Sequence, residues 1–370
     1  MKKIITRLIA YFLMLGLIVI VPAMVIDPYN VFHPYKPSDN GIESNKGFIK
    51  TEYLKKHYSE FDSLLFGSSR AGFVDIGYLN EALGASFYDM ASSESLVSEQ
   101  YIELKELIDS GFVPKRVWVL VDDISCFVDP KIHENRLYRV AYPSGKIFDR
   151  SEFYLKYTDP VMLVDSLKII KETKETKAQD ISNGIDNSFD NSTGMSYLER
   201  YYHTGTERLD KPSQFDPNEE QYQKGYWVDY YSLRTSEAIN DIRDFANLCD
   251  EYNIELTVVT NPLYYLTYRQ GIENGYLSYV EDLSQVTDFY NFSSFSDVTE
   301  DYTYYYETSH FMPSVTRMMI DCIVLDKCDQ KLRDQGFGVK VTKENVDDLM
   351  NILYRQAEER NVSVYGVELR

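Results

Sequence analysis

Residues 62–70 read Asp-Ser-Leu-Leu-Phe-Gly-Ser-Ser-Arg, an apolar run that ends in a turn of small polar residues. A short apolar run bounded by turn residues predicts a buried β-strand, here from Asp62 to Phe66. A second run, Arg-Val-Trp-Val-Leu-Val at 116–121, ends in Asp122-Asp123. Buried strands of this kind predict a parallel sheet with polar residues at its carboxyl ends.

Helical and strand-like stretches alternate around these two runs. We expect helices at 75–83, 94–110, 231–252, 266–282, 313–325 and 342–359, and further strands at 86–90, 255–260 and 287–291. This alternation predicts a three-layer α/β/α, flavodoxin-like parallel sheet with helices on both faces. Ligands in such folds bind beyond the carboxyl ends of the strands.

The middle of the chain interrupts the alternation. Residues 127–230 are rich in Tyr, Asp, Asn and Ser, and predict a large insertion or lid. Within them we expect a helix at about 158–176 and a mobile loop from Ala178 to Gly194. The expected domains are an anchor at 1–26, an α/β domain at 27–325 that contains the insertion, and a C-terminal helical extension at 326–370.

The N-terminal segment predicts a membrane anchor. Residues 8–26 carry no charge, and nineteen residues of helix cover roughly the 30 Å hydrocarbon core of a bilayer. Three basic residues and no acidic residue precede the run, which places the N-terminus in the cytoplasm and the rest outside. The alternative is a cleaved signal peptide, but Pro-Ala-Met-Val at 22–25 poorly matches a cleavage site.

The composition of the rest of the chain limits the classes of molecule that it can bind. Residues 27–370 keep 35 of the 38 basic residues and all 58 acidic residues, for a net charge of −23. This charge argues against nucleic acid and anionic lipid headgroups, and leaves a neutral glycan open. The four cysteines are too few and too irregularly spaced for a disulfide scaffold or a zinc site, so we expect buried free thiols, with a bridge as the alternative in an oxidising compartment. They are Cys126, Cys249, Cys322 and Cys328.

Ser69 and His310 are the leading candidates for chemistry. Ser69 lies on a tight strand-to-helix turn, where Gly67 permits unusual backbone angles and the serine hydroxyl and N–H can face a substrate. His310 lies just before Pro313, which begins a predicted helix, and Glu307 can orient the imidazole in a Ser/His/acid relay. Each residue also has an interpretation without chemistry. Ser69 can be a helix cap, His310 an exposed histidine, and Glu307 a partner of a helix dipole.

The order and spacing of these motifs resemble the SGNH hydrolase superfamily over residues 27–325. In that family a serine follows the first strand in a Gly-Asp-Ser type motif, matched here by Leu-Phe-Gly-Ser-Ser-Arg at 65–70. A histidine near the end of the domain lies in Asp-x-x-His, matched by Glu-Thr-Ser-His at 307–310. The likeness is greatest to a membrane-anchored branch that includes alginate O-acetylation proteins and the D-alanyl-lipoteichoic acid transfer protein.

The resemblance implies an SGNH-type sheet, a serine nucleophile at Ser69 and a base at His310, with Glu307 in place of the usual aspartate. It implies no metal or organic cofactor. It also suggests a membrane-bound O-acyltransferase as a partner, which would export the acyl groups.

Two oxyanion motifs of the family differ in this chain. The second-motif glycine has no clear counterpart, because Met-Ala-Ser at 90–92 follows the second strand. The third-motif asparagine is missing, and Asp122 and Asp123 lie in its neighbourhood. An ionised carboxylate cannot donate a hydrogen bond. Another donor is therefore needed, and the candidates are the Ser92 hydroxyl and the Asn261 amide. Arg70 can stabilise negative charge or form a surface ion pair.

The sequence thus predicts an extracytoplasmic serine esterase or O-acyltransferase that modifies a cell-envelope polysaccharide or teichoic acid through an acyl-enzyme. The alternative is a catalytically inactive SGNH-like scaffold or glycan-binding subunit of an envelope modification complex. The altered oxyanion motifs favour the alternative, whereas the retained Ser69 and His310 favour the enzyme. In either case we expect a single-pass protein of the cell membrane.

Overall fold

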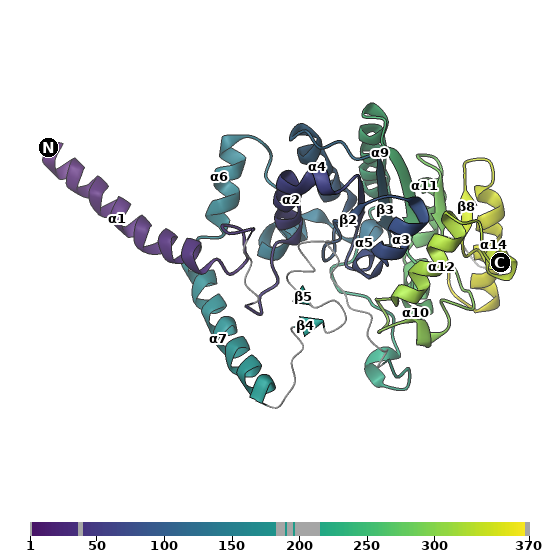
Figure 1. Ribbon diagram of the computed structural model, residues 1–370. Helices are drawn as coiled ribbons and strands as arrows, with labels where there is room; N and C mark the ends of the chain where they lie inside the picture. The colour runs from purple at the N-terminus through teal and green to yellow at the C-terminus, as the bar shows by residue number, and fades with distance from the viewer. Residues whose placement is uncertain (1, 36–39, 183–188, 191–194, 197–214, 367–370) are drawn as a thin grey trace. The chain divides into compact units, whose positions relative to one another are not determined.

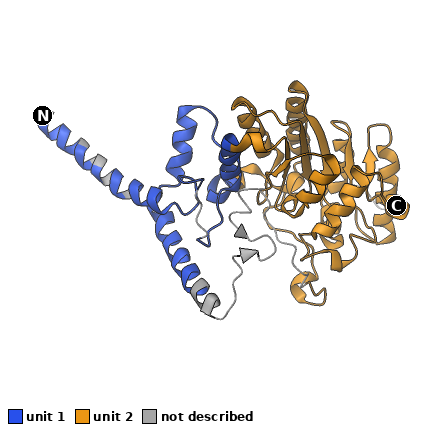
Figure 2. Cartoon of the chain, viewed as in Figure 1, with its two compact units in different colours: residues 1–56, 133–202 blue, residues 57–132, 203–370 orange. Residues whose placement is uncertain are grey.

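The computed structural model describes residues 2–35, 40–182, 189–190, 195–196 and 215–366. The chain forms two compact units, which Figure 2 draws in blue and orange. Unit 1 takes residues 1–56 and 133–202, and unit 2 takes residues 57–132 and 203–370. The predicted anchor and much of the predicted insertion therefore belong to unit 1, and the main sheet belongs to unit 2.

Unit 2 is built on a six-stranded sheet in the order β2-β1-β3-β6-β7-β8. Figure 1 labels β2, β3 and β8 of this sheet. The first five strands are parallel, and β8 pairs antiparallel with β7 at one edge. The order of the parallel strands is that of flavodoxin-like folds, so the predicted α/β class is confirmed. The strands are β1 (Ser63–Gly67), β2 (Phe87–Asp89), β3 (Arg116–Val121), β6 (Glu255–Thr260), β7 (Phe289–Asn291) and β8 (Val339–Val341).

Helices cover both faces of this sheet. α4 packs against α9 and α9 against α11, whereas α3 packs against α12 and β2. Because both faces are covered, β1 is buried at every position, which explains its apolar sequence. The helices of unit 2 are α3 (Ile76–Leu83), α4 (Val97–Asp109), α5 (Asp123–Phe127), α9 (Thr235–Glu251), α10 (Tyr265–Glu273), α11 (Tyr276–Leu283), α12 (Pro313–Ile323), α13 (Gln330–Asp334) and α14 (Val346–Glu359).

Several predicted elements differ from the structure. The C-terminal part, expected as a helical extension at 326–370, also supplies the edge strand β8 of the sheet. The helix expected at 266–282 is two helices, α10 and α11, because Gly275 between them has a φ of +111°. The loop expected from Ala178 begins later, since helix α7 continues to Ser182. Of the rest of that loop, the described part is β4 (Phe189–Asp190), which pairs antiparallel with β5 (Met195–Ser196).

Unit 1 is largely helical around an aromatic cluster. The ring of Phe48 lies 5.4 Å from that of Tyr142 and 4.7 Å from that of Phe153. The side-chain amide of Asn45 donates a hydrogen bond to the Val140 carbonyl at 2.8 Å and so joins the two stretches of chain that form unit 1. The helices are α1 (Lys2–Ile26), α2 (Lys46–His57), α6 (Ile147–Lys156) and α7 (Pro160–Ser182).

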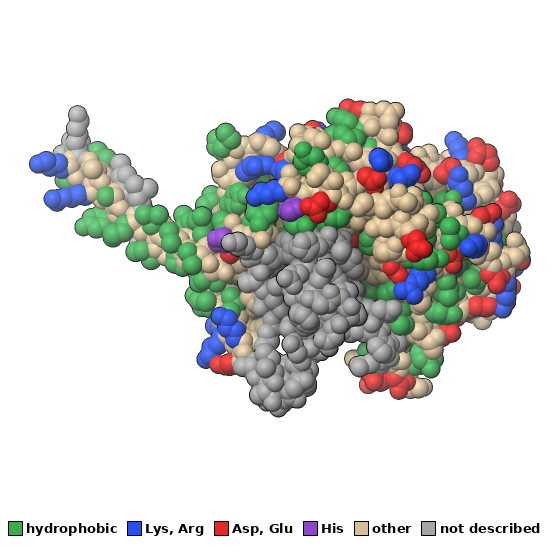
Figure 3. Space-filling model, in the orientation of Figure 1, with side chains coloured by type: hydrophobic (Ala, Val, Ile, Leu, Met, Phe, Trp, Pro, Cys, Tyr) green, Lys and Arg blue, Asp and Glu red, His purple; other side chains and the backbone are tan. Residues whose placement is uncertain are grey.

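Hydrophobic side chains lie along α1, and many of them are exposed, as the green surface of this helix shows (Figure 3). Leu17 and Ile18 are about three-fifths exposed. Among the residues that the structure describes, however, no helix has the length and apolar character that a membrane crossing requires. The membrane anchor stays a prediction.

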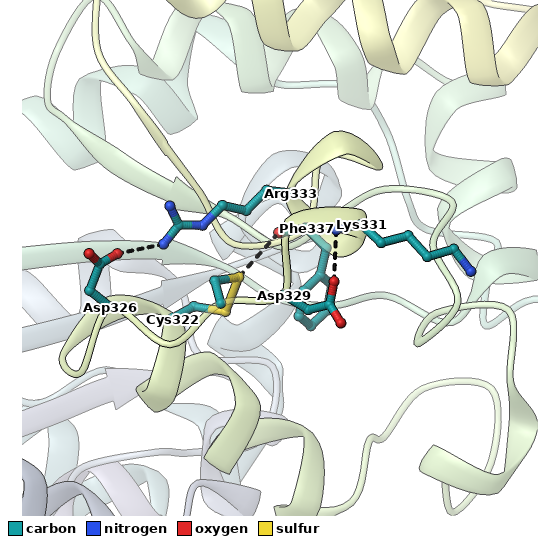
Figure 4. Close-up of a disulfide and its surroundings, with 7 residues drawn as sticks. Cys322, Asp326, Asp329, Lys331, Arg333 and Phe337 are labelled. Carbon is teal, nitrogen blue, oxygen red and sulfur yellow. Dashed lines mark hydrogen bonds and ion pairs between the residues drawn. A yellow bond between two sulfur atoms is a disulfide. The ribbon is translucent and has the colours of Figure 1, made fainter.

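The cysteines fall into two pairs of different chemistry. Cys126 and Cys249 are buried free thiols, as predicted. Cys322, near the end of α12, forms a disulfide with Cys328 (Figure 4), so the expectation of free thiols is wrong for this pair. The chain turns back after α12 and brings the two Cα atoms within 4.2 Å. Gly338 packs against the bridge, and a Cβ there would lie 2.9 Å from the sulfur of Cys322.

Replacing Cys322 and Cys328 together with serine should lower the free energy of unfolding by about 2 kcal/mol. A bridge between residues six apart removes roughly that much loop-closure entropy from the unfolded chain. Urea denaturation of the variant and of the unmodified chain, with and without dithiothreitol, measures the effect. The unmodified chain under reducing conditions is the control and should match the variant; equal stability in all samples would contradict the prediction.

Candidate active site

Ser69 follows β1 on a turn that leads into a short 3₁₀ helix at Ala71–Phe73. Gly67 is required there because a Cβ at this position would lie 2.6 Å from the Cβ of Ala71. The Ala71 N–H donates to the Ser68 carbonyl at 3.0 Å and closes the turn. The turn therefore places a partly exposed serine hydroxyl at the carboxyl end of the sheet.

His310 lies in a closed loop between β7 and α12. Tyr305 and Phe311 form an antiparallel bridge at the base of the loop, and the Tyr306 N–H donates to the His310 carbonyl at 2.9 Å. The ring of Phe73 packs beside the imidazole, with 5.1 Å between the ring centres. Because Phe73 ends the 3₁₀ helix after Ser69, the segment that carries the serine also supports the histidine.

The structure brings Ser69, His310 and Glu307 together. The Ser69 Oγ lies 2.8 Å from His310 Nε2, and Glu307 Oε1 forms a hydrogen bond with His310 Nδ1. The other carboxylate oxygen, Oε2, accepts the Ser309 N–H at 2.6 Å, which fixes the Glu307 side chain at both oxygens. With its proton on Nδ1, the imidazole can accept the serine proton at Nε2.

Glu307 is suited to be the counter-ion of this histidine. Burial raises the pKa of Glu307, but the hydrogen bond and charge of His310 and the N–H of Ser309 act in the other direction and prevail. The pKa therefore lies below the ordinary value of 4.5, and the carboxylate is ionised at neutral pH. A fixed negative charge at Nδ1 stabilises the imidazolium that forms when Ser69 loses its proton.

Arg70, the residue after the serine, is fully buried. Its Nη1 lies 2.8 Å from Asp122 Oδ2 and 2.5 Å from Asp123 Oδ1, both at the end of β3. Its Nε donates to the Ser309 carbonyl at 2.7 Å, and Nη2 donates to the Ser309 Oγ at 3.2 Å. The guanidinium thus joins the end of β3 to the loop that carries His310. The prediction of a surface ion pair is therefore wrong for Arg70, because its ion pairs are with two buried carboxylates.

The charges of this cluster do not cancel. Burial opposes the charge of Arg70, but Asp123 and Asp122 outweigh it and hold the pKa of the guanidinium well above its ordinary value. Burial also raises the pKa of Asp123 to about 6, although Arg70 opposes that shift. Among the described residues, Asp123 Oδ2 has no hydrogen-bond partner. Two buried carboxylates therefore share one cation in this cluster.

Asp122 and Asn261, two candidates for the oxyanion region, are bound to each other. Asp122 Oδ2 accepts the Asn261 amide at 2.9 Å and the Ser68 hydroxyl at 2.8 Å. Its Oδ1 accepts the Ile124 N–H at 3.0 Å and caps α5. The asparagine amide is therefore engaged by Asp122, which acts here as a buried acceptor.

Ser92, the third candidate, lies beside the serine turn. Its N–H donates to the Gly67 carbonyl at 3.3 Å, and the residue is 1% exposed. The structure thus places Ser92 next to the strand end that carries Ser69. Its hydroxyl stays a candidate donor, together with the Ser69 N–H.

Sequence reasoning placed Arg70 on the surface and missed the role of Ser309. Part of the cluster could have been inferred, because β1 and β3 are neighbouring parallel strands. Arg70 follows one strand and Asp122-Asp123 follow the other, so opposite charges meet at one edge of the sheet. The contact of Arg70 with Ser309 joins residues 239 apart and has no local signal.

Comparison with known proteins leaves the family open. The chain matches no protein-family model and no curated protein. The SGNH resemblance therefore stays a prediction from two short motifs.

Arg70→Met should lower the free energy of unfolding by about 3–5 kcal/mol, because it leaves two buried carboxylates without their cation. Urea denaturation of the purified chain measures the loss. Arg317→Met is the matched control, since Arg317 is half exposed in its ion pair with Asp75 and should change stability by less than about 1 kcal/mol. Equal effects of the two substitutions would show that the buried cluster contributes no more than a surface pair.

Glu307→Gln should lower kcat for ester hydrolysis by roughly 10²-fold or more, because an amide cannot serve as counter-ion to the imidazolium. The acid limb of kcat/KM should also move to lower pH, since protonation of His310 is no longer favoured by a carboxylate. Rates with p-nitrophenyl acetate from pH 4 to pH 9 measure both effects.

Glu307 also makes the stability of the fold depend on pH. Because its pKa is lower in the folded chain than the ordinary value of 4.5, its contribution to the free energy of unfolding is present above pH 4.5 and is lost as the pH falls through the folded pKa.

The control for the kinetic prediction is Glu307→Asp, which keeps the charge and should retain the acid limb of kcat/KM. A Glu307→Gln profile that superposes on that of the unmodified chain would rule out a counter-ion role.

Proposed function

We propose that this protein is a serine esterase or O-acyltransferase that works through an acyl-enzyme on a cell-envelope polysaccharide or teichoic acid. The observation that carries the proposal is the alignment of Ser69, His310 and Glu307. A serine 2.8 Å from a histidine that is itself oriented by a carboxylate is the arrangement that activates a hydroxyl for nucleophilic attack.

The reaction has two steps of acyl transfer. Ser69 Oγ attacks the carbonyl carbon of an acyl ester, and its proton passes to His310 Nε2. The leaving alcohol takes that proton, and the acyl group remains on the serine as an ester. An acceptor hydroxyl, or water, then gives its proton to His310 and attacks the acyl carbon. Ser69 departs with the proton and is restored.

The oxyanion of each tetrahedral intermediate needs hydrogen-bond donors. The Ser69 N–H, the Ser92 hydroxyl and the second N–H of the Asn261 amide are our candidates, since the first N–H of that amide is bonded to Asp122. Backbone N–H groups at such a turn are preorganised donors, and one donor is worth roughly 2.7–4 kcal/mol of barrier. Arg70 acts as a positioning residue, because its contacts lead to the His310 loop and not to the serine hydroxyl.

The fold supports the SGNH-type assignment. The serine follows the first strand of a parallel sheet, and the histidine precedes the last helix of the α/β pattern, α12, at the carboxyl edge. In the resembled family these are the positions of the nucleophile and the base. The flavodoxin-like strand order agrees with that family as well.

We further propose that α1 anchors the protein in the cell membrane with unit 2 on the outer side. The uncharged residues 8–26, the basic residues before them and the exposed apolar side chains of α1 support this. Acyl groups exported by a membrane-bound O-acyltransferase would then reach Ser69 at the membrane surface.

One observation favours a second candidate, a non-catalytic SGNH-like scaffold or glycan-binding subunit. In the described part of the chain, Asn261 is fully buried and donates one of its two amide N–H groups to Asp122, which ties this candidate donor to a carboxylate. An acyl-enzyme could then form slowly or fail to form. The two candidates differ in whether Ser69 reacts with an acylating or phosphonylating reagent.

A fluorophosphonate probe should label the purified full-length chain, and Ser69→Ala should abolish the labelling. Ser278→Ala is the matched control, because Ser278 is an exposed serine on α11 and should not alter the labelling. His310→Ala should slow labelling by roughly 10²-fold or more. If the unmodified chain fails to label, or labels as well in Ser69→Ala, the enzyme proposal is overturned and the scaffold is favoured.

A further inference from the structure

Residues 225–234, here called the tyrosine segment, are attached at three points to the elements around the candidate site. The first point is the His310 loop. The Tyr226 N–H donates to Thr267 Oγ1 at 2.8 Å, and Thr267 Oγ1 donates to the Thr308 carbonyl at 2.6 Å. Tyr226 is therefore two hydrogen bonds away from the loop that holds the proposed base.

The second point is α5, which follows β3. The N–H groups of Ser232 and Arg234 donate to the carbonyls of Phe127 and Cys126 at 2.9 and 3.0 Å. The ring of Trp227 packs edge-on against Phe127, with 5.1 Å between ring centres. These contacts hold the segment against the carboxyl edge of the sheet.

The third point is Glu94, in the loop after β2. The Tyr230 hydroxyl donates to the Glu94 carboxylate. Glu94 has a φ of +52°, a conformation that is uncommon outside glycine and is concentrated at functional sites. It lies two residues after Ser92, whose N–H bonds the Gly67 carbonyl at the serine turn. Glu94 thus belongs to a loop that is bonded to the serine turn through Ser92, and its carboxylate is bonded to Tyr230.

The segment offers neutral donors in negative surroundings. Burial, followed by the charges of Glu94 and other groups, raises the pKa of Tyr226 to about 12, so its hydroxyl stays protonated. Tyr231 is 9% exposed, and its hydroxyl has no hydrogen-bond partner among the described residues. The carboxylates that act on these tyrosines are Glu94, Asp122 and Asp123, against the guanidinium of Arg70. Arg234, at the end of the segment, is paired with Asp241.

We propose that Glu94, Tyr226 and Tyr230 form an acceptor subsite that binds the hydroxyl groups of a neutral sugar and excludes phosphate-rich or uronate polymers. Carboxylate and phenol oxygens pair with sugar hydroxyls, and half-buried aromatic rings cover the apolar face of a sugar ring. The negative surroundings repel an anionic acceptor. This inference rests on the proposed acyl transfer and narrows its substrate to a neutral polysaccharide.

The test uses the full-length chain with p-nitrophenyl acetate as donor and two acceptors of equal length, neutral xylohexaose and anionic hexagalacturonate. Acetylated xylohexaose should exceed acetylated hexagalacturonate by about 10-fold or more at low ionic strength. Glu94→Gln and Tyr230→Phe should each raise the KM for xylohexaose by roughly 10-fold, the usual effect of one lost hydrogen bond. The p-nitrophenol burst, which reports acylation by the donor, is measured in the same variants so that a change in acceptor KM is separated from a change in acylation.

Tyr252→Phe is the matched control. Tyr252 precedes β6 and so lies at the opposite, amino edge of the sheet, where it should alter neither the KM nor the burst. Equal transfer to hexagalacturonate, or an unchanged KM in both subsite variants, would overturn the proposal. Circular dichroism of each variant checks that it folds.

A binding measurement separates this proposal from acyl transfer itself. Isothermal titration of xylohexaose into Ser69→Ala should give binding that Glu94→Gln weakens in the same background. If this binding is seen but the unmodified chain gives no burst, the acceptor subsite stands and the acyl-enzyme proposal fails. If the burst is seen but xylohexaose does not bind, the subsite fails and the acyl-enzyme proposal stands.

Discussion

A single buried guanidinium joins the parts of the candidate active site. The serine comes from the end of β1 and the histidine from a loop far along the chain, and the ladder of the sheet does not extend to that loop. Arg70 makes the connection, because the same side chain meets the acids after β3 and the carbonyl of Ser309. An unpaired charge or carbonyl in the interior is costly, so few other arrangements of these groups are stable.

The cluster of Arg70, Asp122 and Asp123 also contributes to the electrostatic environment of the Ser69–His310–Glu307 relay. Two carboxylates around one cation leave negative charge close to the relay, and Glu307 and Glu94 add to it. Negative surroundings favour the imidazolium that forms during acyl transfer. They also disfavour anionic substrates, so one set of charges bears on both rate and selectivity.

Much of the fold could be read from local sequence. β3 and β6 have the predicted bounds, because apolar runs between polar turns leave little choice of register. The break at Gly275 was missed because the apolar periodicity continues across it. Helix α2 was missed as well, since its apolar residues do not follow a clear helical stripe.

The candidate site could be predicted only in part, because local sequence does not reveal contacts between distant residues. Ser69, His310 and Glu307 carry recognisable motifs, and the structure places them in contact. The pairing of Tyr230 with Glu94 spans 136 residues and depends on how the chain returns to the sheet after unit 1. Such contacts are set by tertiary packing and leave no periodic trace in the sequence.

The division of the chain has a consequence for how this protein can diversify. The relay, the guanidinium cluster and the tyrosine segment all belong to unit 2, and the chain leaves that unit after Ile132 and re-enters it at His203. Unit 1 has its own contacts between residues 1–56 and 133–202, such as those of Phe48 with Tyr142 and Phe153. Changes in unit 1 can therefore alter its surface while the reacting groups of unit 2 keep their geometry.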